Sequence, residues 1–135
     1  MSDRPLVMVV DDDFDSLEII RQILVAGGYR VEVFSDPMDA LERMREVKPD
    51  LVVTDLMMKT IDSGLSFSRL LNYDPRWQGI PIVLVTSAVK KRGLIIQVRA
   101  ENALEKMGID AYFDKPVNPQ ALLAKVAELL AARKE

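Results

Sequence analysis

The stretch Leu6-Val-Met-Val-Val10-Asp11-Asp12-Asp13 places five consecutive apolar residues directly before three aspartates. A continuous apolar run of this length, rich in valine, is typical of a parallel strand that is buried on both faces of its sheet. Four more short segments rich in β-branched or aromatic residues follow along the chain. We therefore expect five strands, at Leu6–Val10, Val31–Phe34, Leu51–Thr54, Ile80–Val85 and Ala111–Phe113.

Between these strands, apolar residues recur at the spacing of amphipathic helices. Asp15 and Glu18 are expected to form a capping box at the start of the first helix, and Gly27-Gly28 is expected to end it. Asp36-Pro37 is expected to begin the second helix. The spacing predicts five helices, which contain Leu17, Ile20 and Leu24; Met38, Leu41 and Met44; Leu65–Tyr73; Leu94–Met107; and Leu122, Val126 and Leu129. Strands alternating with helices predict the α/β fold class, with a doubly wound five-stranded parallel sheet covered on both faces.

The composition limits the chemistry that the chain can perform. Its 135 residues correspond to one domain, and they include no cysteine and no histidine. Thiolate and imidazole metal sites, thiol nucleophiles and serine-type triads are therefore excluded. The net charge of −3 does not favour direct binding to nucleic acid or to an anionic membrane. Because neither a signal-peptide pattern nor an apolar run of about 20 residues occurs, we expect a cytoplasmic protein.

Polar residues directly follow all five predicted strands. The role of a helix cap explains Ser35-Asp36 after the second strand, and the residues after the other four strands are candidates for chemistry. These candidates are Asp11-Asp12-Asp13 after the first strand, Asp55 after the third, Thr86-Ser87 after the fourth and Asp114-Lys115-Pro116 after the fifth. Taken singly, an aspartate in such a position most often caps the next helix. Taken together, these residues converge at the carboxyl edge of a parallel sheet, where such folds bind ligands. Converging carboxylates repel one another and stay ionised only if a cation joins them, and a set of oxygen ligands suits Mg²⁺. A central carboxylate can also attack phosphorus as a nucleophile. The pattern therefore predicts a Mg²⁺-assisted phosphoryl acceptor.

Four segments make the chain resemble the receiver domain of two-component response regulators over essentially its whole length. They are Val9–Asp13, Pro49–Met58, Pro81–Ala88 and Tyr112–Pro116. The resemblance implies the flavodoxin-like strand order 2-1-3-4-5 and one receiver domain over residues 1–135, with no output domain. It also implies that Asp55 is the phosphoryl acceptor. Asp11 and Asp12 would hold Mg²⁺ together with Asp55, and the backbone carbonyl of Met57 would complete the protein ligands.

The same resemblance implies how such a domain signals. The phosphoryl donor would be a phosphohistidine of a sensor histidine kinase or of a phosphotransfer protein. Thr86 and Lys115 would contact the phosphoryl group, and Thr86 and Tyr112 would switch orientation. The surface of the fourth helix, fifth strand and fifth helix would then change its affinity for a downstream protein, as a monomer or as a phosphorylation-dependent dimer. The chain would catalyse only its own phosphorylation and dephosphorylation.

Two segments depart from the pattern of that family. Lys59 stands where proline usually follows Met58, and the stretch to Gly64 is slightly longer than usual. Lys59 either pairs with a carboxylate or the phosphoryl group or, as we favour, is solvated. The segment 87–110 is also longer than usual and opens with the basic run Lys90–Gly93, which is either an exposed loop or part of an altered partner surface.

Two other functions fit parts of the sequence. A receiver-like module that binds a partner without being phosphorylated is compatible with Lys59, but the complete set of site residues argues against it. A phosphatase resembling the haloacid dehalogenase class also forms an aspartyl phosphate, and Asp11-Asp12-Asp13 satisfies its Asp-x-Asp motif. That class places its nucleophile after the first strand, is usually longer, and does not require Asp55.

Overall fold

Five parallel strands form one sheet in the computed structural model of the chain, which describes residues 4–55, 71, 73–87 and 109–132. The strands are β1 (Leu6–Val10), β2 (Arg30–Phe34), β3 (Leu51–Thr54), β4 (Ile82–Thr86) and β5 (Ala111–Asp114). Their spatial order is β2-β1-β3-β4-β5, and neighbouring strands pair in parallel. The predicted α/β class and the order 2-1-3-4-5 are confirmed. β4 begins after Pro81 rather than at Ile80, because proline has no N–H to offer a central strand.

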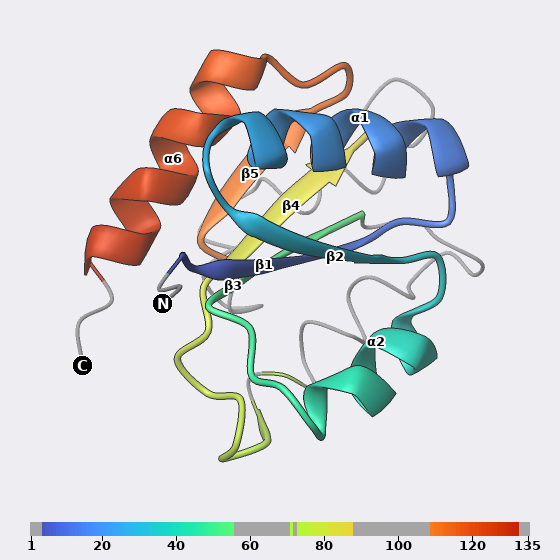
Figure 1. Cartoon of the computed structure of the whole chain (residues 1–135), viewed down its shortest axis with the longest axis vertical. Coiled ribbons are helices and arrows are strands. Elements are labelled where there is room, and N and C mark those ends of the chain that lie inside the picture. The colour runs from blue at the N-terminus through green and yellow to red at the C-terminus, as the bar shows by residue number, and fades with distance from the viewer. Residues whose placement is uncertain (1–3, 56–70, 72, 88–108, 133–135) are drawn as a thin grey trace, which may run out of the picture.

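Three helices lie within the described residues, and they cover both faces of the sheet. They are α1 (Phe14–Ala26), α2 (Pro37–Met44) and α6 (Pro119–Ala132). Figure 1 shows α1 and α6 on one face of the sheet and α2 on the opposite face. The helices expected over residues 65–73 and 94–107 lie outside the described residues, apart from residues 71 and 73. None of the three helices is long and apolar enough to cross a membrane.

The sheet separates two apolar clusters, because side chains alternate between its faces. Met8 and Val10 of β1 belong to the cluster under α2, whereas Val7 and Val9 belong to the cluster under α1 and α6. The α2-face cluster also contains Ala40, Met44, Val52, Leu71, Trp77, Ile80, Ile82, Leu84 and Ile109. The other cluster contains Leu17, Ile20, Leu24, Leu51, Val53, Val83, Val85, Leu122 and Val126. The inward residues predicted for α1 are thus confirmed, as are Leu122 and Val126 of α6, while Leu129 packs half-buried against the same cluster.

The start of α1 differs from the predicted capping box. Asp13 is the N-cap, and its carboxylate accepts hydrogen bonds from the Asp15 N–H (3.2 Å) and the Ser16 hydroxyl (3.0 Å). Asp15 lies inside the first turn, and Glu18 pairs with Arg21 instead of reaching back to the cap. The reason is the extended backbone of Asp13 (φ −93°, ψ 112°), which lets its side chain reach the N–H two residues on.

The second helix confirms its predicted start and two of its three predicted inward residues, Leu41 and Met44. Asp36-Pro37 provides the N-cap and the first helical residue. Met38, which was expected to face the core, is 65% exposed, whereas Ala40 and Met44 are buried and Leu41 packs against them half-buried. Ala40 and Met44 are four residues apart and therefore share the stripe that faces the sheet, while Met38 lies in the first turn outside it.

Two aspartates fasten neighbouring strands together at the amino edge of the sheet. The Leu6 N–H donates to the Asp50 carboxylate (2.7 Å), and the Asp50 N–H donates back to the Leu6 carbonyl (2.8 Å). Ile82 and Asp110 form the same two bonds, at 2.9 and 2.8 Å, between β4 and β5. Each clamp lies where a strand begins, so it helps to set the register that brings the carboxyl ends of these strands together at the other edge.

Asp50→Ala is expected to lower the free energy of unfolding by about 1–3 kcal/mol, because the Leu6 N–H loses its acceptor in a partly buried position. Asp50→Asn keeps an acceptor oxygen and should lose less. Urea unfolding followed by the fluorescence of Trp77, the single tryptophan, measures the change. Glu42→Ala on the exposed side of α2 is the control, with an expected change below about 0.5 kcal/mol. A loss for Asp50→Ala no larger than that of the control would contradict the role of the clamp.

Candidate functional site

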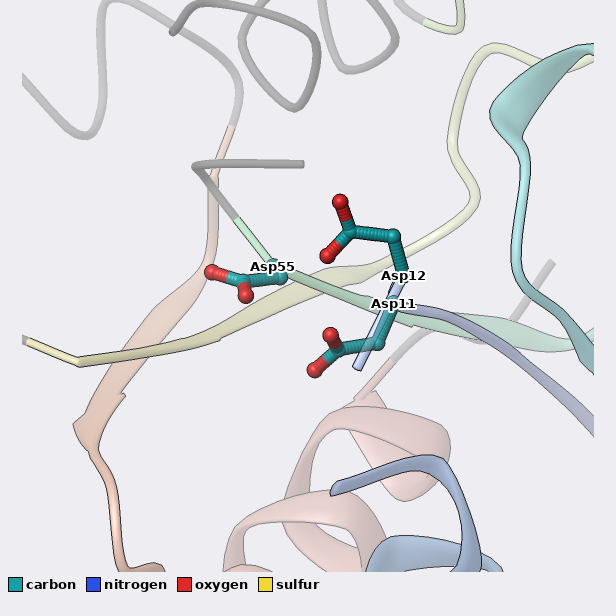
Figure 2. A group of neighbouring side chains, drawn as sticks. All are labelled: Asp11, Asp12 and Asp55. Atoms are coloured by element: carbon teal, nitrogen blue, oxygen red, sulfur yellow. The ribbon is translucent and has the colours of Figure 1, made fainter. Parts of the chain in front are cut away.

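The residues predicted to carry the chemistry meet at the carboxyl edge of the sheet. Asp11 and Asp12 follow β1, Asp55 follows β3, Thr86 ends β4 and Lys115 follows β5. Because β1 and β3 are neighbours in the sheet, the segments that follow them lie beside each other. Figure 2 shows the side chains of Asp11, Asp12 and Asp55 gathered at this place from those two segments.

Three carboxylates form an acidic cluster, which consists of Asp11, Asp12 and Asp55. One oxygen of each lies within 4.8 Å of the others, and no other group of three or more acidic side chains in the described part of the chain has this spacing. Asp11 is 1% exposed and Asp55 is 6% exposed, whereas Asp12 faces solvent. A donor set made only of carboxylate oxygens fits a hard divalent cation such as Mg²⁺, which binds few protein ligands and keeps several waters. Met57, the remaining predicted ligand, lies outside the described residues.

Lys115 links the two buried carboxylates of the acidic cluster. Its Nζ donates to Asp11 Oδ2 at 2.8 Å and to Asp55 Oδ2 at 3.0 Å. Its backbone N–H donates to the Thr86 carbonyl (2.9 Å), which holds the lysine beside the end of β4. The ammonium group therefore offsets part of the negative charge of the cluster and stands next to an oxygen of Asp55.

Burial and charge shift the protonation equilibria of this site. Burial raises the pKa of Asp11 to about 6, and the charge of Asp55 adds to that effect, although hydrogen bonds from Lys115 and the Asp13 N–H oppose it. Burial lowers the pKa of Lys115, but its hydrogen bonds and charge interactions with Asp11 and Asp55 outweigh burial, so its pKa is raised. Because the pKa of Asp11 is higher in the folded protein than in a free carboxyl group, stability is lost as the pH rises from the ordinary pKa of an aspartate to about 6, and the cost stays constant at higher pH. A cation bound to the cluster offsets that cost.

Asp13 supports the acidic cluster without belonging to it. Its N–H donates to Asp11 Oδ1 at 2.9 Å, so each oxygen of Asp11 has a hydrogen-bond donor. Its own carboxylate is occupied as the cap of α1. The third aspartate of the run is therefore a helix cap, and Asp12 is the carboxylate that the cluster presents to solvent.

Asp12→Asn is expected to weaken Mg²⁺ binding about tenfold, because one unit charge near a cation at a solvent-facing position contributes roughly 1–2 kcal/mol. The same substitution relieves repulsion within the metal-free cluster, so the thermal midpoint without metal should rise. Calorimetric titration with Mg²⁺ and thermal unfolding measure the two effects. Glu42→Gln on the exposed side of α2 is the control and should change neither. A variant that lost both affinity and metal-free stability would show that Asp12 serves the fold instead.

Thr86 brings an unsatisfied hydroxyl to the same edge. It is 1% exposed, and its Oγ1 is the one buried side-chain polar atom of the described residues that has no hydrogen-bond partner. A buried hydroxyl without a partner costs free energy. An acceptor oxygen brought beside it would therefore be bound favourably.

Tyr112, the predicted switch residue, forms a hydrogen bond that sequence reasoning missed. Its hydroxyl donates to Asp114 Oδ1 on the same strand, while its ring packs half-buried against the α2-face cluster. The signal that could have found this pair is the spacing of two residues, which places both side chains on one face of a strand. Lys59 and the basic run Lys90–Gly93 lie outside the described residues.

Comparisons with known proteins agree on one family. The family model for the response regulator receiver domain matches residues 7–127. The DNA-binding response regulator MtrA of Mycolicibacterium paratuberculosis is 32% identical over 123 residues, which cover 91% of this chain and 50% of MtrA. The chain thus spans about half the length of the first curated relatives that it matches.

In two further comparisons, the alignment covers nearly the whole of this chain and of the similar protein. The polar-differentiation response regulator DivK of Brucella anthropi is 27% identical, over 92% of this chain and 94% of DivK. The crystal structure of a CheY-like response regulator receiver domain protein from Methanospirillum hungatei has a TM-score of 0.80 to this chain at 25% identity, with 97% of each chain covered.

Proposed function

The chain belongs to the family of response regulator receiver domains of two-component signalling, and we propose that it accepts a phosphoryl group on Asp55. The proposal rests on one observation, the arrangement of polar groups around Asp55. At a single edge of the sheet, Asp55 lies beside two further carboxylates and a lysine ammonium group, and the neighbouring strand β4 ends there in Thr86 with its unpaired hydroxyl. These groups are what an aspartyl-phosphate site needs: a nucleophile, a cation site, and donors for the phosphoryl oxygens.

In the proposed reaction, Asp55 is the nucleophile. Its N–H donates to the Val10 carbonyl (3.1 Å), which holds its backbone against the end of β1. An oxygen of Asp55 attacks the phosphorus of a phosphohistidine, so a P–O bond forms while the N–P bond breaks. The electron pair stays on the leaving imidazole nitrogen, which takes up a proton from solvent.

The neighbours of Asp55 stabilise the charge that is transferred. Lys115 Nζ, 3.0 Å from Asp55 Oδ2, is placed to pair with an oxygen of the phosphoryl group. The Thr86 hydroxyl, which has no partner, is available to donate to another. When bound at the acidic cluster, Mg²⁺ neutralises negative charge on the carboxylates and on the phosphoryl oxygens.

The proposed response to phosphorylation follows from the same contacts. The phosphoryl group adds close to two negative charges beside Thr86 and Lys115. Both side chains then turn toward it, Tyr112 turns inward, and the surface around β5, α6 and the helix predicted at residues 94–107 changes its affinity for a downstream protein. The change is a shift between two packings of one fold.

The proposed partners are a histidine kinase or a phosphotransfer protein as donor and a downstream protein as target. The chain has no histidine, so it supplies no phosphohistidine of its own. It acts as a switch rather than as an enzyme on other substrates, and catalyses only its own phosphorylation and dephosphorylation. The signalling form is a monomer or a phosphorylation-dependent dimer.

Intact mass spectrometry after incubation with a small-molecule phosphodonor tests the proposal. We expect the wild-type protein to gain one phosphoryl group in the presence of Mg²⁺ and none in the presence of a chelator. Repeated failure to gain a phosphoryl group with Mg²⁺, from either a small-molecule donor or a phosphohistidine protein, would overturn the proposal. That result would favour the module that binds its partner without phosphorylation.

A further inference from the structure

We propose that Asp114 is a positioning residue that latches Tyr112 outward, and that this latch sets how readily phosphorylation switches the domain. The inference rests on the proposed function and deepens it. The observation behind it is the hydrogen bond from the Tyr112 hydroxyl to Asp114 Oδ1, one residue before Lys115.

The register of the sheet places this bond at the level of the switch residue Thr86. Tyr112 lies opposite Leu84, and Asp114 lies opposite Thr86, in the pairing of β4 with β5. Side chains two residues apart share a face of a strand, so these four side chains stand on the face that carries the α2-face cluster. The hydrogen bond therefore runs along β5 toward its carboxyl end, beside Thr86, whose hydroxyl has no partner.

The burial of the two side chains indicates which orientation of Tyr112 the hydrogen bond favours. The Tyr112 ring is half-buried and packs against the apolar cluster, whereas Asp114 is exposed. The ring is thus held by packing, while its hydroxyl is held by a carboxylate on the solvent side. An inward turn of Tyr112 must break this bond, so the bond lowers the population of the inward orientation in the unphosphorylated protein.

The size of the effect follows from the value of one hydrogen bond. A bond to a carboxylate is stronger than a neutral one, but solvent competes for an exposed acceptor. A net contribution of ordinary size changes the ratio of the two orientations by about two- to tenfold. A ligand that binds better to the inward state gains apparent affinity by up to the same factor when the latch is removed.

Asp114 also has a second, purely electrostatic route to the site. Its charge lies next to Lys115 in sequence, so removing it changes the field that a bound phosphoryl group experiences. That contribution does not pass through Tyr112. A double-mutant cycle between Asp114 and Tyr112 separates the two routes.

The experiment measures the affinity of four proteins for beryllofluoride, a phosphoryl mimic, at saturating Mg²⁺. The proteins are the wild type, Asp114→Ala, Tyr112→Phe and the double variant. We expect Asp114→Ala to bind about two- to tenfold more tightly than the wild type. The substitution should have a smaller effect in the Tyr112→Phe background, where the donor hydroxyl is absent and only the electrostatic route remains. Asp114→Asn keeps an acceptor oxygen and should lie between the wild type and Asp114→Ala.

A second measurement observes Tyr112 directly. In protein labelled with fluorotyrosine, the Tyr112 resonance is identified by its absence in Tyr112→Phe, since the chain has three tyrosines. We expect Asp114→Ala to move this resonance, without any ligand, part of the way toward its position in the beryllofluoride complex. A merely structural role of Asp114 would not move it in that direction.

The outcomes distinguish the latch from the proposed function. If the wild type binds beryllofluoride but Asp114→Ala has the same effect with and without the Tyr112 hydroxyl, the latch is overturned and the proposed function stands. If Asp114→Ala leaves both the affinity and the Tyr112 resonance unchanged, the latch is also overturned. If the wild type binds no beryllofluoride with Mg²⁺ present, the proposed function fails and the latch fails with it.

Discussion

The Asp55→Asn protein is expected to gain no phosphoryl group under conditions in which the wild type is fully phosphorylated. The substitution keeps the size and planarity of the side chain but removes the anionic oxygen that attacks phosphorus. It also removes one of the three carboxylates of the acidic cluster, so Mg²⁺ binding should weaken at the same time. Intact mass spectrometry with a small-molecule donor and Mg²⁺ gives the fraction phosphorylated.

A matched control separates this chemistry from a general effect of losing one aspartate. Asp39→Asn, on the exposed side of α2, should be phosphorylated like the wild type. Phosphoryl gain by Asp55→Asn would contradict Asp55 as the acceptor. If peptide mapping then located the group on Asp11 or Asp12, the nucleophile would follow β1, as in the haloacid dehalogenase class, and turnover of small phosphate esters would become the next measurement.

Lys115→Met is expected to lower the free energy of unfolding by about 3 kcal/mol in the absence of Mg²⁺, because it leaves two carboxylates without their ammonium partner. Asp11 and Asp55 are almost fully buried, and Lys115 donates to both. Mg²⁺ can supply the missing positive charge. At a concentration one hundred times its dissociation constant, Mg²⁺ should stabilise the variant by about 2.7 kcal/mol over its metal-free form. The difference from the wild type should narrow, because the cluster without the ammonium group attracts the cation more strongly.

The recovery by Mg²⁺ is the informative part of this prediction. Urea unfolding of the wild type and of Lys115→Met, with Mg²⁺ and with a chelator, measures it. Lys125→Met on α6 is the matched control, since Lys125 pairs with Glu128 at the surface, and it should change stability by less than about 1 kcal/mol in either condition. A loss for Lys115→Met that Mg²⁺ did not reduce would show that the lysine stabilises the fold by packing rather than by charge.

Strand and helix periodicity was enough to predict the α/β class, because each element has a local sequence pattern, whereas the strand order 2-1-3-4-5 was predicted from the resemblance to receiver domains. The valine-rich run of β1, the aspartates that precede or follow strands, and the leucines of α1 at helical spacing are all short-range patterns. The predictions were wrong where the local sequence pattern is compatible with more than one structure. Asp13 and Asp15 are both good N-caps, and only the backbone conformation of Asp13 decided between them. Met38 has the spacing of a core residue, but the first turn of α2 leaves it exposed.

By itself, the sequence determined which chemical groups are available and which strand ends carry them. The absence of histidine and cysteine left carboxylates, hydroxyls and lysines, and the alternation of elements placed Asp11, Asp55, Thr86 and Lys115 at one edge. Only the tertiary structure decided which atom meets which. Lys115 contacts carboxylates 104 and 60 residues away, the Thr86 hydroxyl has no partner, and Tyr112 bonds to Asp114. Such contacts depend on strand register and on side-chain orientation across the sheet, and local periodicity along the chain does not encode either of them.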